Sequence, residues 1–358
     1  MTSLLGDNLI FIISQPRSGS TLLQLILSSH EDIVTTSEPW IALHPVYALK
    51  EKGIAGEYNS VLARDALKDF LQQSGIDEDY YKQCLASFLQ SLYEQAIEKQ
   101  GGRWFLDKTP RYWGIIPEIN ELFPRAKFIF LFRNPLAVLN SILKTWVKDD
   151  WRRLRTEYRK DLLIAPRKLL DGAKVLGERC IRIKYEDLVT ESKATVKRVC
   201  AFLDVDYCDG LIEYGRRKRP KWRFGDTVKV FMYNSPNVKS LNSWRSGFKS
   251  SQSKYMAMCY LRELGPSLIQ EMGYDIEEME SVIEPPEGGG HIIPWRVLMG
   301  DSDDLLDMIE LDLYLHPERM RDIVHRYAKV DRGLGGFLFR SCAAVTKRFG
   351  KFRSKING

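Results

Sequence analysis

Residues 14–21 read Ser-Gln-Pro-Arg-Ser-Gly-Ser-Thr, and side chains of these types at this spacing can bind an anionic group. An apolar run from Leu9 to Ile13 precedes the loop, and an apolar-periodic segment follows it from Leu22. In a strand-loop-helix unit, backbone N–H groups and the helix N-terminus point at a bound anion. The loop therefore predicts a phosphate-type site, with Arg17 as its cation and Gly19 allowing close backbone approach.

The same loop lacks the lysine of nucleotide-binding P-loops. In the pattern G-x-x-x-x-G-K-[ST], that lysine meets the β- and γ-phosphates of a nucleoside triphosphate. Here Gly19 and Thr21 match the pattern, Ser14 replaces the first glycine and Ser20 replaces the lysine. The loop therefore favours an anion other than a triphosphate chain.

A second segment places a cation at the end of a strand. The apolar run Phe128 to Phe132 is followed by Arg133-Asn134-Pro135, and Ser141 lies eight residues after Arg133. Asn134 is suited to cap a helix whose first residue is Pro135. Arg133 would then lie at the strand tip, and Ser141 about two turns along the helix.

These two segments resemble the 5′-phosphosulfate loop and the 3′-phosphate site of sulfotransferases, which use 3′-phosphoadenosine-5′-phosphosulfate (PAPS). The matching stretches run from about residue 8 to about residue 275. The resemblance implies that the loop surrounds the 5′-phosphosulfate, that Arg133 and Ser141 bind the 3′-phosphate, and that Tyr185 lies near the nucleotide. A core aromatic at a strand end is the alternative for Tyr185. The implied cofactor-binding residues are Arg17, Ser18, Gly19, Ser20, Thr21, Arg133, Ser141 and Tyr185.

Two further residues are implied to be catalytic. Glu38 stands where carbohydrate- and tyrosine-directed relatives, and similar bacterial enzymes, keep a general base; a capping or surface carboxylate is the alternative. His44 is the competing base. Lys108, in Asp-Lys-Thr-Pro, resembles a lysine that approaches the bridging oxygen of the phosphosulfate, although an exposed turn lysine would have the same local sequence. No metal is expected, because the transferred group carries less negative charge than a γ-phosphoryl.

The chain departs from the resemblance in the loop expected to close over the nucleotide. Relatives place a cation just before a Trp, whereas Ser243 precedes Trp244 here. Lys239 and Arg245 are the candidates to compensate, and the sequence does not assign the closing residues.

Apolar runs that alternate with helical patterns predict an α/β fold with a P-loop-like parallel sheet flanked by helices on both faces. Strand-like runs lie at 9–13, 104–106, 126–132 and 180–185, with a shorter one or a turn at 31–37. Helical patterns lie at about 22–30 and about 62–99, the latter broken near Gly75.

The character of the chain changes in its last part. We expect a sulfotransferase domain at 1–280, then a linker with a helical, basic C-terminal extension at 281–358. Residues 284–290 read Glu-Pro-Pro-Glu-Gly-Gly-Gly, typical of a linker. The aromatic and basic tail could make peripheral membrane contact or bind a partner, but a helix packing on the main domain is the favoured interpretation.

Composition indicates a globular protein of 358 residues, 44% hydrophobic and 28% charged, with a net charge of +6. Six scattered cysteines indicate neither a disulfide framework nor a zinc site. No basic leader precedes the first strand and no apolar run is long enough to cross a bilayer, so we expect a cytoplasmic protein.

The favoured function is sulfuryl transfer from PAPS to a hydroxyl on a sugar, glycolipid or other small molecule. A P-loop kinase or nucleotide-binding protein is the alternative, weakened by the missing lysine. A nucleic-acid-binding module would use the basic cluster 216–223, but only Trp222 within that cluster could stack on a base, so no nucleic-acid partner is expected. A solvated loop explains the cluster equally well.

Overall fold

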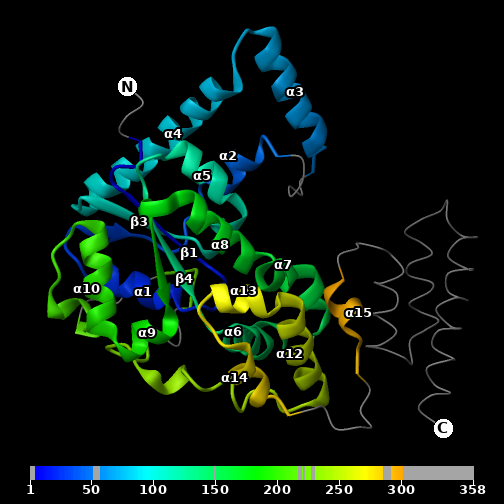
Figure 1. Ribbon diagram of the computed structural model, residues 1–358. Helices are drawn as coiled ribbons and strands as arrows, with labels where there is room; N and C mark the ends of the chain where they lie inside the picture. Colours follow the sequence, from blue (N-terminus) through cyan, green and yellow to red (C-terminus); the bar gives the residue numbers. More distant parts are fainter. Residues whose placement is uncertain are drawn as a thin grey trace, which may run out of the picture. The chain divides into compact units, whose positions relative to one another are not determined.

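The computed structural model describes residues 5–50, 57–148, 150–216, 220, 222–226, 230–284 and 292–300 (Figure 1). The chain divides into two compact units. Unit 1 comprises the described residues up to Ile142 together with Lys160–Gly247 and Leu261–Val282. Unit 2 comprises Leu143–Arg159, Phe248–Tyr260 and the described residues from Ile283 on. The division into 1–280 and 281–358 stays a prediction, and most of the expected C-terminal extension lies outside the described residues.

Unit 1 contains a five-stranded parallel sheet with the strand order β2-β3-β1-β4-β5. The strands are β1 (Leu9–Ser14), β2 (Ile33–Thr35), β3 (Trp104–Lys108), β4 (Lys127–Phe132) and β5 (Cys180–Lys184). Since the strands are parallel, their carboxyl ends lie at one edge, where ligands of open α/β sheets bind. The predicted α/β sheet is confirmed.

Helices follow the strands along the chain. Those of unit 1 are α1 (Ser20–Leu27), α2 (Leu43–Tyr47), α3 (Ser60–Gln73), α4 (Glu78–Gln100), α5 (Ile116–Leu122), α6 (Pro135–Ile142), α8 (Ala165–Leu176), α9 (Tyr185–Thr190), α10 (Ser192–Leu203), α13 (Pro266–Glu271) and α14 (Ile276–Ser281). The remaining α-helices of the described residues are α7 (Arg159–Leu163), α12 (Ser251–Leu264) and α15 (Trp295–Met299). Short turns of 3-10 or π geometry are η1 (Pro110–Ile115), η2 (Leu143–Val147), η3 (Leu154–Tyr158), η4 (Gly177–Arg179), η5 (Asp209–Leu211), η6 (Tyr214–Arg216) and η7 (Val238–Ser240).

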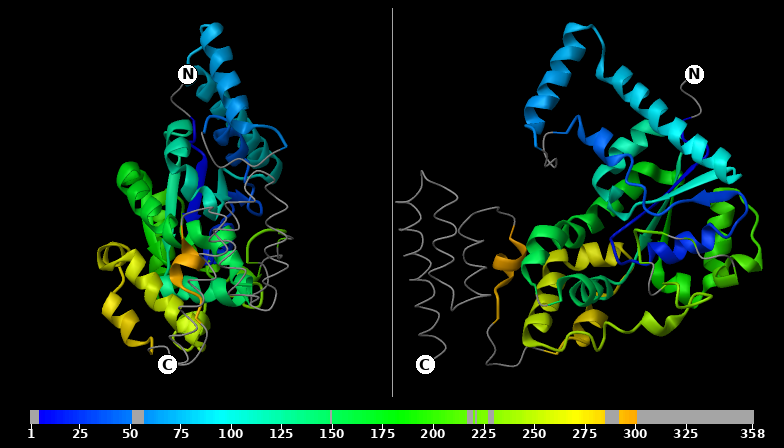
Figure 2. Two further views of the ribbon diagram at one scale, coloured as in Figure 1. Left: turned by 90° about the vertical axis from the view of Figure 1, so that its right-hand side faces the viewer. Right: turned by 180° about the vertical axis from the view of Figure 1, so that it is seen from behind.

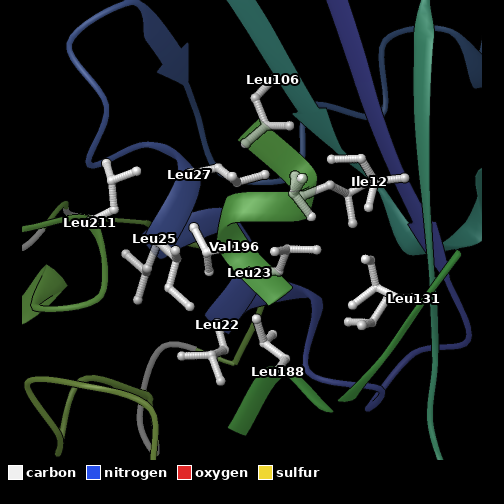
Figure 3. Close-up of a cluster of buried hydrophobic side chains, with 14 of the residues drawn as sticks. Ile12, Leu22, Leu23, Leu25, Leu27, Leu106, Leu131, Leu188, Val196 and Leu211 are labelled. Atoms are coloured by element: carbon white, nitrogen blue, oxygen red, sulfur yellow. The ribbon is translucent and has the colours of Figure 1, made fainter. Parts of the chain in front are cut away.

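Helices cover both faces of the sheet, as Figures 1 and 2 show. Every residue of β1 is buried, which is the pattern of a parallel strand covered on both sides. On one face, Ile10 and Ile12 belong to an aliphatic cluster with residues of α1, α9 and α10, such as Leu23, Leu188 and Val196 (Figure 3). Burial of this aliphatic surface holds α1, and with it the loop before α1, against the sheet.

The opposite face of the sheet packs against aromatic side chains. The ring of Phe11 lies 6.2 Å from that of Tyr93 on α4, 5.8 Å from that of Phe123 after α5, and 5.5 Å from that of Phe128 on β4. On α8, Gly172 allows close packing on this face, because a Cβ there would lie 2.9 Å from Cγ2 of Ile116 and 3.2 Å from the ring of Phe130. Alternate residues of each strand thus pack into two different cores.

The predicted break between two helices near Gly75 is confirmed by α3 and α4. Each helix begins at a side-chain cap: Asn59 accepts hydrogen bonds from two N–H groups of α3, and Asp77 accepts one from Tyr80 of α4. Gly75 has φ 67°, a conformation that favours glycine. No helix among the described residues is both long enough and apolar enough to traverse a bilayer.

Candidate active site

The anion loop, residues 14–21, runs from the end of β1 into the first turn of α1 and contains two residues with positive φ. Gly19 has φ 93° and Arg17 has φ 70°, which is uncommon for a residue with a side chain. The Gly19 carbonyl accepts the N–H of Leu22, so the loop leads directly into the first turn of α1. A Cβ on Gly19 would lie only 2.4 Å from a ring carbon of Tyr185, so the tyrosine covers the loop and excludes any side chain there.

Glu38, Lys108 and Thr21 meet at the carboxyl edge of the sheet. The Lys108 Nζ lies 2.7 Å from Oε1 of Glu38 and 3.4 Å from Oγ1 of Thr21. Lys108 is the last residue of β3 and its side chain is fully buried, so the exposed-turn alternative is wrong. Burial lowers the pKa of Lys108, and the charge of Glu38 opposes that shift. The ammonium thus joins the carboxylate to the first turn of α1.

Trp40 holds the second oxygen of the same carboxylate. Its indole Nε1 donates a hydrogen bond of 3.1 Å to Oε2 of Glu38. His44, the competing base in the sequence, lies on α2 and is exposed. The structure therefore places Glu38, and not His44, in contact with Lys108.

Arg133 lies at the end of β4, and Asn134 caps the following helix as predicted. The Asn134 Oδ1 accepts the N–H groups of Leu136 and Ala137 at 3.0 and 3.2 Å. The Arg133 guanidinium donates to the carbonyl of Arg17 at 2.8 Å and stacks over the Tyr185 ring, 4.2 Å from its centroid. Burial is the main reason that the pKa of Arg133 is lowered.

Ser141 contacts the side chain of Arg17. The Arg17 Nε donates to Oγ of Ser141 at 3.1 Å, across 124 positions of sequence. From the sequence, Arg17 was expected at the 5′-phosphosulfate and Ser141 at the 3′-phosphate, as separate groups. In the structure the Arg17 side chain extends from the anion loop to Ser141, so one network connects the two assigned regions.

A segment that no sequence motif indicates, Gly225-Asp226, lies against this network. The Asp226 carboxylate pairs with Arg17 at 2.9 Å, and the backbone N–H of Asp226 donates to Oγ1 of Thr21 at 3.1 Å. A Cβ on Gly225 would lie 3.0 Å from Nζ of Lys108. Asp226 follows the basic cluster closely in sequence, but no pattern in the chain connects it to a loop some two hundred positions earlier.

In the loop expected to close over the nucleotide, Ser240 contacts two of the predicted site residues, Tyr185 and Arg133. Its hydroxyl lies 2.7 Å from that of Tyr185, and its carbonyl accepts from Arg133 at 3.4 Å. Lys239 lies over the Tyr233 ring and Arg245 pairs with Glu278. Of the basic cluster, residues 217–219 and 221 lie outside the described residues, and Trp222 packs near Phe231.

Two buried polar atoms in this region have no hydrogen-bond partner among the described residues: Oγ of Ser18 and Nε of Arg133. Buried donors are normally satisfied, so these two fit a ligand that brings its own acceptor oxygens. Together with the N-terminus of α1, they are suited to phosphate groups. Within the part of the chain that the structure describes, no group of three or more acidic, His or Cys side chains is arranged to hold a metal ion.

Comparison with known proteins identifies the family of the chain. The family model described as "Sulfotransferase family" matches residues 9–209, more than half of the chain. The chain therefore belongs to the sulfotransferase family of enzymes.

Two curated relatives and one solved structure are similar to the chain. Nodulation protein NoeE of Sinorhizobium fredii is 28% identical over 74% of this chain and 65% of its own length. A putative protein-tyrosine sulfotransferase of Caenorhabditis briggsae is 24% identical over 75% of this chain and 90% of its own. The sulfotransferase domain of the Synechococcus PCC 7002 olefin synthase, at 22% identity, has a TM-score of 0.50 over 75% of this chain and 95% of that domain. The chain thus spans slightly less than two thirds of NoeE, and the solved structure supports the fold.

Proposed function

We propose that this protein transfers a sulfuryl group from PAPS to a hydroxyl acceptor, with Glu38 as general base. The observation that carries the proposal is the position of Lys108, whose ammonium contacts both the Glu38 carboxylate and Thr21 of the anion loop. A proton acceptor, a cation and a helix N-terminus lie together, as in-line sulfuryl transfer requires.

In the proposed reaction, Glu38 takes the proton of the acceptor hydroxyl as the hydroxyl oxygen attacks sulfur. The bond between sulfur and the bridging oxygen breaks, and that oxygen leaves with the electron pair as part of the 3′,5′-bisphosphate. Lys108 offsets the charge that develops on the bridging oxygen. Lys108 and the loop supply the positive charge, so the proposed step needs no metal ion.

The donor's nucleotide would be held by the loop and by the Arg133 region. Ser18 to Thr21 present backbone N–H groups and hydroxyls to the 5′-phosphosulfate. Arg133, Ser141 and Tyr185 are proposed for the 3′-phosphate and the nucleoside, with Arg17 between the two ends. The unpartnered Nε of Arg133 supports this assignment.

We propose a sugar or glycolipid hydroxyl as the acceptor, because the Glu-Lys pairing resembles carbohydrate-directed enzymes. A tyrosine hydroxyl is the second candidate, since one similar protein is named a protein-tyrosine sulfotransferase. A cytoplasmic location is part of the proposal. It is supported by the free thiols of the cysteines within the described residues.

The test is Glu38→Gln, assayed with labelled PAPS and a panel of sugar, glycolipid and tyrosine-peptide acceptors. The proton acceptor acts in the transition state, so we expect its removal to lower kcat by about a hundredfold or more. The Kd for adenosine 3′,5′-bisphosphate, measured by calorimetry, should stay within about twofold.

Glu31→Gln serves as the control, because Glu31 is an exposed carboxylate on the turn before β2. It should retain wild-type turnover. Retention of most of the rate by Glu38→Gln would reject Glu38 as the base and make His44 the next residue to test.

A further inference from the structure

We propose that Trp40 is a positioning residue that orients Glu38, leaving Oε1 as the oxygen that takes the acceptor proton; this rests on the proposed function. The two carboxylate oxygens are in different surroundings. The indole N–H holds Oε2 at 3.1 Å, whereas Oε1 lies 2.7 Å from Lys108, which in turn contacts the anion loop. Oε1 therefore faces the region assigned to the sulfuryl group. A carboxylate oxygen has two lone-pair sites, so Oε1 can accept from Lys108 and from an acceptor hydroxyl.

The backbone of Trp40 shows that the indole is held in place. Trp40 has φ 57°, a genuine outlier for a bulky aromatic residue, and such outliers persist only where the surroundings determine them. The turn that follows is anchored, because the N–H of Ala42 donates to the Tyr112 hydroxyl at 3.1 Å. The strained conformation directs the indole N–H towards Glu38.

A cation lies over the same indole ring. The Arg111 guanidinium is 5.9 Å from the Trp40 ring centroid and is itself paired with Asp161: its Nε and Nη2 lie 3.0 and 2.7 Å from Oδ2. Asp161 is 2% exposed and also accepts the indole N–H of Trp113 at 3.1 Å. The carbonyl of Asp161 accepts from Gln15, at the start of the anion loop, at 2.9 Å.

These contacts form a continuous path from one end of the anion loop to the other. It runs from Gln15 through Asp161 and Arg111 to Trp40, and then through Glu38 and Lys108 to Thr21 at the other end of the loop. Trp40 connects the part of this path that contains Glu38 to the part that contains Arg111. Its N–H bond orients Glu38 relative to the loop, and so relative to the donor.

The test compares Trp40→Phe with Trp104→Phe. Phenylalanine keeps a ring beneath Arg111 but removes the N–H, so we expect Trp40→Phe to lower kcat about tenfold or more with the bisphosphate Kd within about twofold. Normal bisphosphate binding also shows that the variant is folded. Trp104 lies at the far end of β3, and its indole N–H has no partner among the described residues. Trp104→Phe should therefore keep kcat within about twofold.

A double-mutant cycle separates positioning from a general structural role. If Trp40 acts through Glu38, adding Trp40→Phe to Glu38→Gln should cause little further loss of single-turnover rate. An equal loss in both backgrounds, or wild-type kcat in Trp40→Phe, would overturn the proposal. Failure of the proposed function looks different: wild-type protein would not turn over PAPS, or Glu38→Gln would stay active.

Discussion

Asp107 is a buried carboxylate directly before the proposed catalytic lysine. It is 1% exposed and accepts hydrogen bonds from the hydroxyls of Tyr93 and Thr109, both at 2.7 Å. Burial raises its pKa to about 6, against the opposing effect of these hydrogen bonds and of Lys108. The sequence predicted a strand-like run only at 104–106, since the local sequence does not reveal that β3 continues through Asp107 to Lys108.

The raised pKa of Asp107 predicts how stability depends on pH. The folded protein binds this proton more tightly than the unfolded chain does, so the contribution is present at low pH and is lost as pH rises from about 4 to about 6. Wild-type protein should lose up to about 3 kcal/mol of unfolding free energy across that window relative to Asp107→Asn. Urea unfolding at pH 4, 5, 6 and 7 measures the difference. The exposed Asp69→Asn variant controls for removal of one carboxylate, and parallel curves for wild type and Asp107→Asn would contradict the prediction.

Helices, strands and caps that depend on neighbouring residues could be predicted from the sequence, whereas contacts between residues far apart in the sequence could not. The strand-loop-helix unit at residues 9–27 and the cap at Asn134 follow from periodicity and capping chemistry, and the structure confirms both. Lys108 was assigned a role only through resemblance, because burial within a sheet is a tertiary property. The contact of Asp226 with Arg17 was missed, because no periodic pattern or motif joins segments so far apart.

The cap of α6 should matter for both stability and binding, because it fixes the helix that begins beside Arg133. Asn134→Ala removes the acceptor for two N–H groups and should lower the unfolding free energy by about 1 kcal/mol. It should also weaken bisphosphate binding, since the position of Ser141 depends on α6. Asn59→Ala removes the equivalent cap of α3, which contributes no proposed site residue, and should leave the bisphosphate Kd unchanged. Urea unfolding and calorimetric titration measure the two effects, and equal Kd values for the two variants would contradict the binding part.

At the scale of the whole molecule, the fold determines where the chemistry lies. β1, β3 and β4 all end at one edge of the sheet, so Ser14, Lys108 and Phe132 bring the anion loop, the proposed catalytic lysine and Arg133 together. Parallel topology alone predicts this convergence once the strands are recognised. It cannot predict which oxygen faces which cation, since that depends on side-chain packing.

Ligand binding at this edge of the sheet should therefore raise the unfolding free energy of the protein. At a hundred times its Kd, adenosine 3′,5′-bisphosphate should stabilise the protein by about 2.7 kcal/mol, measured as a rise in Tm. ATP with Mg²⁺ should stabilise it much less, because the loop lacks the P-loop lysine. Arg133→Ala should reduce the bisphosphate effect, whereas Arg103→Ala, at an exposed position, should not. A larger rise with ATP than with the bisphosphate would favour the kinase alternative.

The carboxylate of Asp226 has a consequence for how an anion enters this site. Arg17 already has a negative partner within the chain, at 2.9 Å. A phosphate that binds this guanidinium would compete with Asp226, so Arg17 would exchange one oxyanion partner for another. The affinity for the phosphate would then reflect the difference in free energy between two ion pairs.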